Sequence, residues 1–462
     1  MVGSESRRNA EFALQAASQQ VLQTLSAFLD ARRLPGDRLC VGLSGGRDSV
    51  VLLHALAALR GFGLAVDLSA VHVNHGLSAN ADTWAAFCDT LCRALGIPLA
   101  VVRVEVPRFG CGEGLEAAAR RLRHAVFAGC DADWLALAHH RDDQAETILF
   151  RLLRGAGVSG AAGMPAERLQ AGGPRLIRPL LDLPRSLLAA YAEENALHWV
   201  EDESNADSRH RRNHLRRQVM PRIEERFPGA AQVLARAGRH FAEAALLLEE
   251  LAKIDRAAAV GVQGRIDLAR FKMLSKARAG NLLRSELLAA GFQAPEARWL
   301  EEALRQLATV GTGSETCVAT RDGEVHVYRG ELHVVCHRPP VAEGPLPWRG
   351  EARLPWGGDQ VVLGSTHGIG ISYRLLRSAP VCLRRRLGGE RIQPDPRRPL
   401  RSLRKLLQEA GVPPWDRARL PLLWSGERLV WVAGIGIDAA FACAPDEPGV
   451  MPVWETAPQP TA

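Results

Sequence analysis

Six consecutive residues near the N-terminus have the composition of a phosphate-binding loop. They are Ser44, Gly45, Gly46, Arg47, Asp48 and Ser49. An apolar run at 39–43 precedes them and a helical pattern at 50–59 follows, so they join a buried strand to a helix. At such a junction, backbone N–H groups and the helix N-terminus converge on one point, which suits an anion. A Gly-rich turn that only caps the helix has a similar composition, so this segment alone leaves both interpretations open.

Asp48 favours the phosphate interpretation. A carboxylate beside a polyphosphate commonly shares a Mg²⁺ ion with it, since two negative groups would otherwise repel each other. Gly45 and Gly46 let the backbone approach an anion and adopt positive φ without a steric penalty. The segment therefore predicts an ATP-binding loop with Asp48 as a ligand of Mg²⁺.

A second polar cluster follows the apolar run at 134–138 and opens a predicted helix. Its members are His139, His140, Asp142, Asp143 and Glu146. Acidic residues at a helix N-terminus are favourable through the helix dipole alone, but this does not account for all five residues. Carboxylates near a phosphate loop suit metal binding or proton removal from a nucleophile. A zinc site is not indicated, because no Cys pair or His-Glu-x-x-His pattern accompanies the histidines.

Arginine-rich segments form the third group. One lies in the predicted helix 114–127 and includes Arg123, and another follows the acidic residues 202–203. The second run contains Arg209, Arg211, Arg212, Arg216 and Arg217. A patch nearer the C-terminus includes Arg384, Arg385, Arg386, Arg391, Arg401, Arg404 and Lys405. These runs could be solvated surfaces, or they could stabilise a transferring phosphoryl group and hold an RNA backbone.

Strands and helices alternate in the segments that carry these clusters. Strands are predicted at 39–43, 66–73, 99–106 and 134–138, and helices at 10–33, 50–59, 80–95, 114–127 and 142–153. This alternation predicts an α/β fold with a doubly wound, Rossmann-like parallel sheet. Ligands of such sheets bind beyond the carboxyl ends of the strands. The phosphate loop, the His-rich turn at 72–76 and residues 139–143 all follow predicted strands, so we expect these three segments to meet in one pocket.

The 462 residues are expected to form several domains. We expect a catalytic domain at 1–225, a mainly helical domain at 226–340, a linker at 341–358, a small basic α/β domain at 359–445 and a disordered tail at 446–462. Residues 155–173, rich in Gly and Ala, are expected to form a mobile loop.

Composition limits the class of protein. The net charge of +7 arises from an excess of Arg, which suits a nucleic-acid partner, although a generally basic proteome would produce the same balance. The nine cysteines include no Cys-x-x-Cys pair, which favours reduced thiols. The polar N-terminus and the absence of a long apolar run predict a cytoplasmic protein without a secretory signal or membrane span. The sequence leaves the oligomeric state open, with a homodimer among the options.

Several segments together resemble one enzyme family. Residues 44–49 resemble the PP-loop of N-type ATP pyrophosphatases. The remaining segments are similar to bacterial tRNA(Ile)-lysidine synthases and occur in the same order: 72–77, 139–147 with 151–155, 202–205 with 212–213, and 405–409 with 412–415. One departure is Ser78, where many members carry a basic residue, so a role for this position is not carried over.

The resemblance implies a ligase that acts on an isoleucine tRNA with a CAU anticodon. ATP adenylates O2 of the wobble cytidine with loss of pyrophosphate, and the ε-amine of L-lysine then attacks C2 with loss of AMP. The product, lysidine, changes the codon read from AUG to AUA.

The resemblance also implies roles for individual residues. Asp48 and the PP-loop bind Mg-ATP, Asp143 or Glu146 accepts the proton of the lysine amine, and His139 and Asp142 position that substrate. Arg123 and Arg212 contact the α-phosphate and the AMP leaving group, and the C-terminal basic patch binds tRNA.

Two other function classes remain as alternatives. A thiolating enzyme with a PP-loop normally needs a Cys pair or an iron–sulfur cluster, which the sequence does not show. A non-catalytic RNA-binding protein with a decayed nucleotide pocket would not need Asp48, Asp143 and Glu146.

Overall fold

The structure is a computed structural model that describes residues 2–32, 36–106, 115–170, 172–201, 203, 211–311 and 316–456. For residues 2–15 and 116 it describes the backbone alone. The chain divides into two compact units, Met1–Leu247 and Leu248–Ala462.

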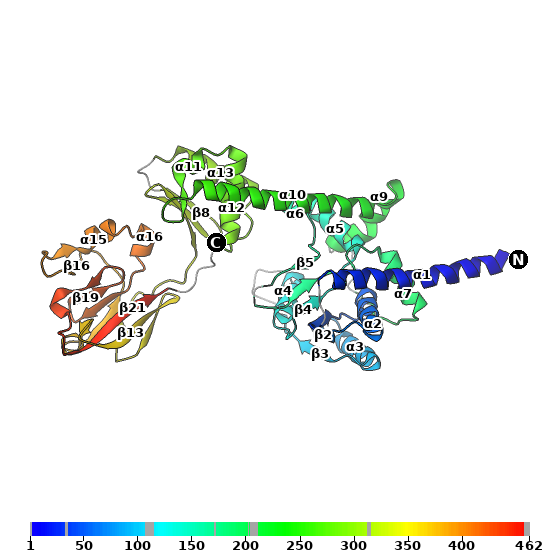
Figure 1. The fold of residues 1–462 in the computed structure, drawn as a ribbon, viewed down its shortest axis with the longest axis horizontal. Coiled ribbons are helices and arrows are strands. Elements are labelled where there is room, and N and C mark those ends of the chain that lie inside the picture. Colours follow the sequence, from blue (N-terminus) through cyan, green and yellow to red (C-terminus); the bar gives the residue numbers. More distant parts are fainter. Residues whose placement is uncertain are drawn as a thin grey trace. The chain divides into compact units, whose positions relative to one another are not determined.

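The first unit contains a six-stranded sheet in the order β3-β2-β1-β4-β6-β5. The strands are β1 (Arg38–Gly42), β2 (Asp67–Asn74), β3 (Leu99–Arg103), β4 (Trp134–Ala136), β5 (Glu167–Arg168) and β6 (Arg175–Ile177). All neighbours pair in parallel except the edge strand β5, which is antiparallel to β6. The predicted doubly wound parallel sheet is confirmed (Figure 1).

Helices cover both faces of this sheet. They are α1 (Val2–Asp30), α2 (Arg47–Gly61), α3 (Ala81–Leu95), α4 (Leu115–Ala128), α5 (Arg141–Leu152), α6 (Val158–Ala161) and α7 (Arg185–Glu194), followed by α8 (Arg211–His214), the π-helical turn η2 (Leu215–Val219) and α9 (Met220–Arg226). The helix α10 (Ala230–Ala259) spans the boundary between the units.

Successive side chains of β1 enter the hydrophobic cores on the two opposite faces of the sheet. Leu39 and Val41 belong to the core formed with α1, α2, α3 and α7, whereas Cys40 belongs to the core on the other face, with Phe127 of α4. A strand covered in this way is apolar throughout, which is the pattern that identified it in the sequence. Its carboxyl end is thereby held in a fixed position at the start of the phosphate-binding segment.

The second unit begins with a small sheet and three helices that share one core. Its strands have the order β7-β10-β9-β8. The elements are β7 (Ile266–Asp267), α11 (Leu268–Lys272), α12 (Lys276–Ala289), α13 (Ala297–Thr309), β8 (Thr316–Ala319), β9 (Gly323–Tyr328) and β10 (Glu331–Cys336).

Two further sheets in this unit share another core. One has the order β11-β15-β18-β19-β20 and the other β12-β13-β21-β14, and β16 pairs with β17. The strands are β11 (Leu346–Pro347), β12 (Arg353–Trp356), β13 (Asp359–His367), β14 (Ile371–Ser372), β15 (Val381–Arg384), β16 (Arg391–Ile392), β17 (Arg401–Ser402), β18 (Leu422–Ser425), β19 (Arg428–Val432), β20 (Gly436–Ile437) and β21 (Pro448–Glu455). The helices are α14 (Tyr373–Leu376), α15 (Leu403–Glu409), α16 (Pro414–Arg417) and the 3₁₀ turn η3 (Ala439–Phe441).

Three segments differ from what composition predicted. The expected loop 155–173 contains α6 and β5, and the expected linker 341–358 contains β11 and β12. The tail expected to be disordered contains β21, which pairs with β13 along its full length; residues 457–462 lie outside the described residues. β11 and β21 pair with strands distant in sequence, whereas β5 and β12 pair with the next strand along the chain. In each case strand pairing overrides the local Pro and Gly content.

Among the described residues, no helix is long and apolar enough to cross a membrane.

Candidate active site

The junction between β1 and α2 has the geometry that phosphate binding requires. Gly46 is the N-cap residue of α2, and no side chain caps that helix end. The first N–H groups of a helix lack intrahelical partners, so the end of α2 presents donors for an anion. Ser44 and Ser49 fix the segment internally, because their hydroxyl groups lie 3.0 Å apart and Ser49 Oγ donates to the Gly46 carbonyl oxygen at 2.8 Å.

Gly45 is required at its position for two reasons. Its φ is +86°, in the left-handed region that favours glycine. A Cβ atom there would meet Val200 Cγ2 at 2.8 Å and Cys88 Sγ at 3.2 Å. The Gly45 carbonyl oxygen also accepts a hydrogen bond from the Val200 N–H at 3.0 Å. The loop is thus packed against a distant segment that cannot move away easily.

The residues of the second motif support the loop from β2. His72 is buried, and its Nδ1 lies 2.8 Å from the Leu43 carbonyl oxygen, directly before the loop. Asn74 forms its own turn by accepting from the Gly76 N–H at 2.9 Å and bonds Asp82 of α3. This motif therefore positions the end of β1 through a buried hydrogen bond.

A histidine links the loop to the carboxylates of α5. The Nε2 atom of His140 lies 3.4 Å from Asp48 Oδ2 and 3.4 Å from Asp143 Oδ2. His140 is also the N-cap of α5: its backbone N–H donates to Asp143 Oδ2, and its Nδ1 accepts from the Asp143 N–H. The carboxyl ends of β1 and β4 thus meet through one buried side chain, as the sequence predicted for these clusters.

Charge interactions favour the ionised forms of these groups. Burial works to raise the pKa of Asp48, but His140 and Arg47 outweigh it and hold that pKa below its usual value. Burial likewise opposes the lowered pKa of Asp143, which His140 and Arg216 produce. The pKa of His140 is raised despite its burial, because Asp48 and Asp143 favour the imidazolium. When Nδ1 gains a proton it becomes a donor, and Asp142 Oδ2 faces it at 3.7 Å.

Arg216 pairs with two of the three carboxylates of α5, those of Asp143 and Glu146. Its Nε lies 2.7 Å from Glu146 Oε1, and its Nη2 bonds Asp143 Oδ1. The other oxygen of Glu146 is buried without a hydrogen-bond partner among the described residues. Sequence analysis placed Arg216 only in an arginine-rich run. The signal available there was its spacing from Arg212, which puts both side chains on one face of a continuous helix.

Three family models match the chain in order. A PP-loop domain model matches residues 15–223, a TilS substrate binding domain model matches 266–333, and a TilS substrate C-terminal domain model matches 381–454. These segments correspond to the parallel-sheet unit, the β7–β10 sheet with its helices, and the part of the last two sheets that runs from β15 to β21.

Curated relatives extend over nearly the whole chain. A tRNA(Ile)-lysidine synthase of Aromatoleum aromaticum is 46% identical over 423 residues, which cover 91% of this chain and 98% of the relative. The chain belongs to the tRNA(Ile)-lysidine synthase family. Another member, from Nitrosomonas europaea, is 44% identical over 92% of this chain and 93% of its own length.

Solved structures resemble parts of this tRNA(Ile)-lysidine synthase family member more distantly. The U34-tRNA thiolase NcsA from Methanococcus maripaludis covers 50% of this chain and 80% of its own, with a TM-score of 0.43 and 17% identity. A crystal structure of a TilS C-terminal domain covers 25% of this chain and 95% of its own, with a TM-score of 0.21 and 20% identity.

Other residues expected at the site of this family member lie near it with different partners. Arg212 is farther from the carboxylates than Arg216, at 4.0 Å from Asp143 and 3.8 Å from Glu146. The Asp142 carboxylate accepts from the Arg185 N–H at 2.9 Å and so holds the start of α7. Arg123 lies on α4 and lowers the pKa of His75, where burial is the larger cause.

The basic patch of this family member is partly neutralised within its own domain. Arg384, Arg386 and Arg401 pair with Glu427, Glu390 and Glu409, respectively. Arg385 faces Glu343 at 3.9 Å. The exposed members of the patch are Arg391, Arg404 and Lys405. The positive charge available to a partner is therefore concentrated on α15 and on β16, before the α15 helix.

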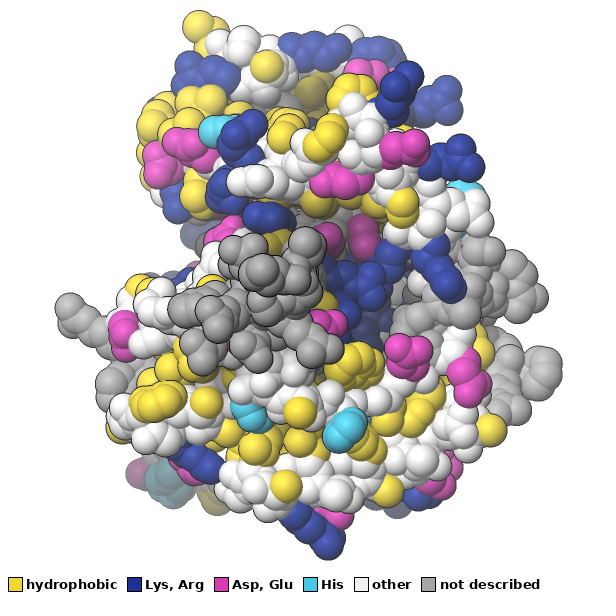
Figure 2. Space-filling view, turned by 90° about the vertical axis from the view of Figure 1, so that its right-hand side faces the viewer, with side chains coloured by type: hydrophobic (Ala, Val, Ile, Leu, Met, Phe, Trp, Pro, Cys, Tyr) yellow, Lys and Arg dark blue, Asp and Glu magenta, His cyan; other side chains and the backbone are white. Residues whose placement is uncertain are grey.

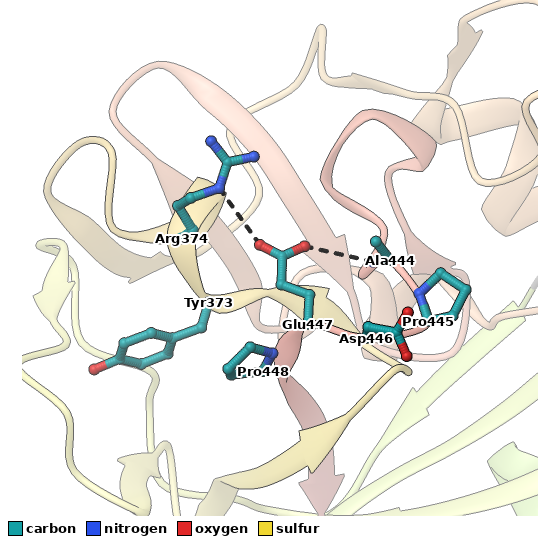
Figure 3. A pocket seen from close by; sticks show the side chains of 7 residues that line it. All are labelled: Tyr373, Arg374, Ala444, Pro445, Asp446, Glu447 and Pro448. Carbon is teal, nitrogen blue, oxygen red and sulfur yellow. Dashed lines mark hydrogen bonds and ion pairs between the residues drawn. The ribbon is translucent and has the colours of Figure 1, made fainter.

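Surface views add two observations on this family member. Lys and Arg side chains gather in a hollow of the face that Figure 2 shows. A separate pocket lies in the C-terminal domain between α14 and the segment before β21 (Figure 3). There Glu447 faces Arg374 at 3.6 Å and accepts from the Ala444 N–H at 3.4 Å, so its carboxylate is engaged by the pocket itself. Neither Glu447 nor Arg374 belongs to the predicted catalytic set.

Proposed function

We propose that the chain ligates L-lysine to C2 of the wobble cytidine of tRNA(Ile) with a CAU anticodon, with ATP as the source of energy. The enzyme is a ligase that forms lysidine on tRNA(Ile), as its membership of the family implies. The observation that carries the proposal to individual residues is the connection Asp48–His140–Asp143, which joins the PP-loop to the carboxylates of α5.

The PP-loop is suited to the first half of the reaction. The uncapped N-terminus of α2 stabilises the pyrophosphate that leaves when the α-phosphate is transferred to O2 of the cytidine. Asp48 fits a Mg²⁺ ion, because Mg²⁺ in such sites takes one or two carboxylates together with substrate phosphates. When bound there, Mg²⁺ neutralises charge on the phosphates.

The α5 carboxylates are suited to the second half. The lysine ε-amine has an ordinary pKa of about 10.4 and must lose a proton before it attacks C2. Asp143 is held in its ionised form and so attracts the ammonium group. Glu146 offers a buried oxygen without a hydrogen-bond partner, which we assign as the proton acceptor.

Arg216 must release these carboxylates when lysine binds, because one guanidinium already occupies both. The π-helical turn that carries Arg216 is a rare conformation that is frequent at functional sites. We assign Arg216, together with Arg212, to the AMP phosphate that leaves in this step.

The decisive experiment is incubation of the full chain with labelled lysine, ATP and a CAU-anticodon tRNA(Ile) transcript, followed by nucleoside analysis. We expect lysidine from the parent and from Asp67→Asn, a control at the exposed start of β2, and at least a hundredfold less from Asp48→Asn and Glu146→Gln. Parental rates in Glu146→Gln would remove that residue as proton acceptor. ATP cleavage without lysine incorporation by the parent would contradict the proposed reaction.

A further inference from the structure

Arg178 is a buried cation, and no carboxylate among the described residues forms an ion pair with it. It follows β6 directly, and the residue is only 6% exposed. Its Nη1 donates to the Pro165 carbonyl oxygen at 2.7 Å, and its Nε has no hydrogen-bond partner in the described part of the chain. A guanidinium removed from water without a carboxylate costs several kcal/mol, so such a group calls for an explanation.

Neighbouring arginines increase the positive charge. Arg151 at the end of α5 also bonds carbonyl oxygens, those of Gly160 at 3.1 Å and Gly163 at 2.6 Å. Arg168 lies exposed on β5. Across the described part of the chain, no carboxylate forms an ion pair with Arg151, Arg168 or Arg178.

Two half-buried histidines at this place, His124 and His139, are held in the neutral form. Burial is the main cause that lowers the pKa of His124 to about 4, and Arg120 and Arg123 add to it. The pKa of His139 is lowered to about 3, again chiefly by burial; Asp143 opposes this shift and Arg178 adds to it. The Nδ1 atoms of both rings are buried without a partner. The cluster thus combines guanidinium groups that pair with no described carboxylate and ring nitrogens without a described hydrogen-bond partner.

The position of the cluster separates it from the PP-loop. Arg178 follows β6, and β4 lies between β6 and β1 in the sheet. The end of β6 therefore lies two strand spacings, or about 10 Å, from the end of β1. When the base of a nucleotide reaches the PP-loop, the sugar–phosphate backbone of that nucleotide must lie away from the PP-loop. We expect this backbone at the same edge of the sheet.

We propose that Arg178, with Arg151, Arg168, His124 and His139 around it, forms a subsite for an RNA phosphodiester that flanks the cytidine under modification. A phosphodiester supplies the missing negative charge, and its oxygens accept from guanidinium and imidazole N–H groups. The subsite rests on the proposed function, since it takes tRNA as the substrate. Its effect is to fix the backbone while the base extends toward ATP.

The test uses tRNA(Ile) in which one phosphate next to the target cytidine is replaced by a neutral methylphosphonate. We expect this change, on the 5′ or the 3′ side, to weaken binding to the parent enzyme about tenfold. Arg168→Gln and Arg178→Lys are expected to bind unaltered tRNA more weakly and to be insensitive to the neutral linkage. The matched control is Arg175→Gln, which removes the same charge from the opposite end of β6, where Arg175 pairs with Glu167 at 3.3 Å.

Each outcome decides the assignment. A neutral linkage without effect on the parent, or with the same effect on parent and Arg168→Gln, overturns the subsite. If the variants raise the KM for ATP and keep their sensitivity to the linkage, the anion is an ATP phosphate. Arg168→Gln alters an exposed side chain, so it answers the question even if Arg178→Lys does not fold. If the neutral linkage weakens binding to the parent but not to the variants, and no lysidine forms, the RNA subsite is upheld and the proposed reaction is refuted.

Discussion

At the scale of single residues, Gly45 shows how tightly the ATP loop is constrained. Its backbone conformation and its contact with Val200 are both incompatible with a side chain. The same contact anchors the loop to the segment after α7, so the geometry of the phosphate site depends on packing far along the chain.

We expect Gly45→Ala to lower the free energy of unfolding by about 1–3 kcal/mol, because it combines positive φ with close contacts. It should also raise the KM for ATP. Thermal unfolding without ATP and the rate of pyrophosphate release would measure the two effects. The control is Gly46→Ala, whose Cβ would meet only Ser44 Oγ at 3.5 Å. Equal unfolding temperatures for the two variants would show that Gly45 is not under the strain described.

Residue types and spacing predicted part of this site. Asp48, His140 and Asp143 were expected at neighbouring strand ends, and the structure brings them together. The position of Arg216 could not be predicted, because it depends on the π-helical turn and on how η2 packs against α5. The burial of Arg178 without a described counter-ion could not be predicted either, because burial is a property of the folded chain.

At the scale of elements, β21 completes a sheet whose other strands come earlier in the chain. Pro448, Gly449 and Pro452 indicate irregular structure when only local propensity is considered. The strand forms because Gln360–His367 of β13 provides a partner along its whole length, and β14 pairs with its beginning. The parallel sheet was easier to predict, because each of its strands is an apolar run next to its own helix.

Removal of residues 448–462 should therefore unfold the C-terminal domain. Val450 would leave the core that it shares with Val361 and Ile371, and the central strand β13 would become an edge. We expect loss of the corresponding cooperative transition in thermal unfolding, together with much weaker tRNA binding. Truncation after Thr456, which keeps β21, is the control. If the shorter chain unfolds with the same profile as the full-length chain, β21 does not hold the domain together.

At the scale of the whole molecule, the proposed catalytic residues and the basic patch of the C-terminal domain lie in different compact units. The net charge of +7 includes the exposed Arg404 and Lys405 of α15, whereas the ATP loop and the α5 carboxylates lie in the first unit. Contacts with phosphates should weaken with salt because they release counter-ions.

We expect Arg404→Glu with Lys405→Glu to raise the KM for tRNA at least tenfold and to leave kcat nearly unchanged, because we propose that these exposed side chains bind the tRNA backbone alone. The slope of log tRNA affinity against log salt concentration should become shallower by the amount expected for the loss of about two phosphate contacts. Binding titrations at several salt concentrations would measure this. Arg353→Glu, on exposed β12 of the same domain, tests for a general charge effect. An unchanged salt dependence would exclude α15 from the interface.

The pairing of β21 with β13 has a consequence for synthesis on the ribosome. The first unit can fold once its own residues have left the ribosomal exit tunnel. The sheet that contains β13 can be completed only after β21 has left the tunnel. A chain released early by a premature stop codon would keep a nucleotide pocket and lack the completed module that carries the exposed basic helix. In such fragments β13 would present unpaired backbone groups, which can pair with a strand of another chain.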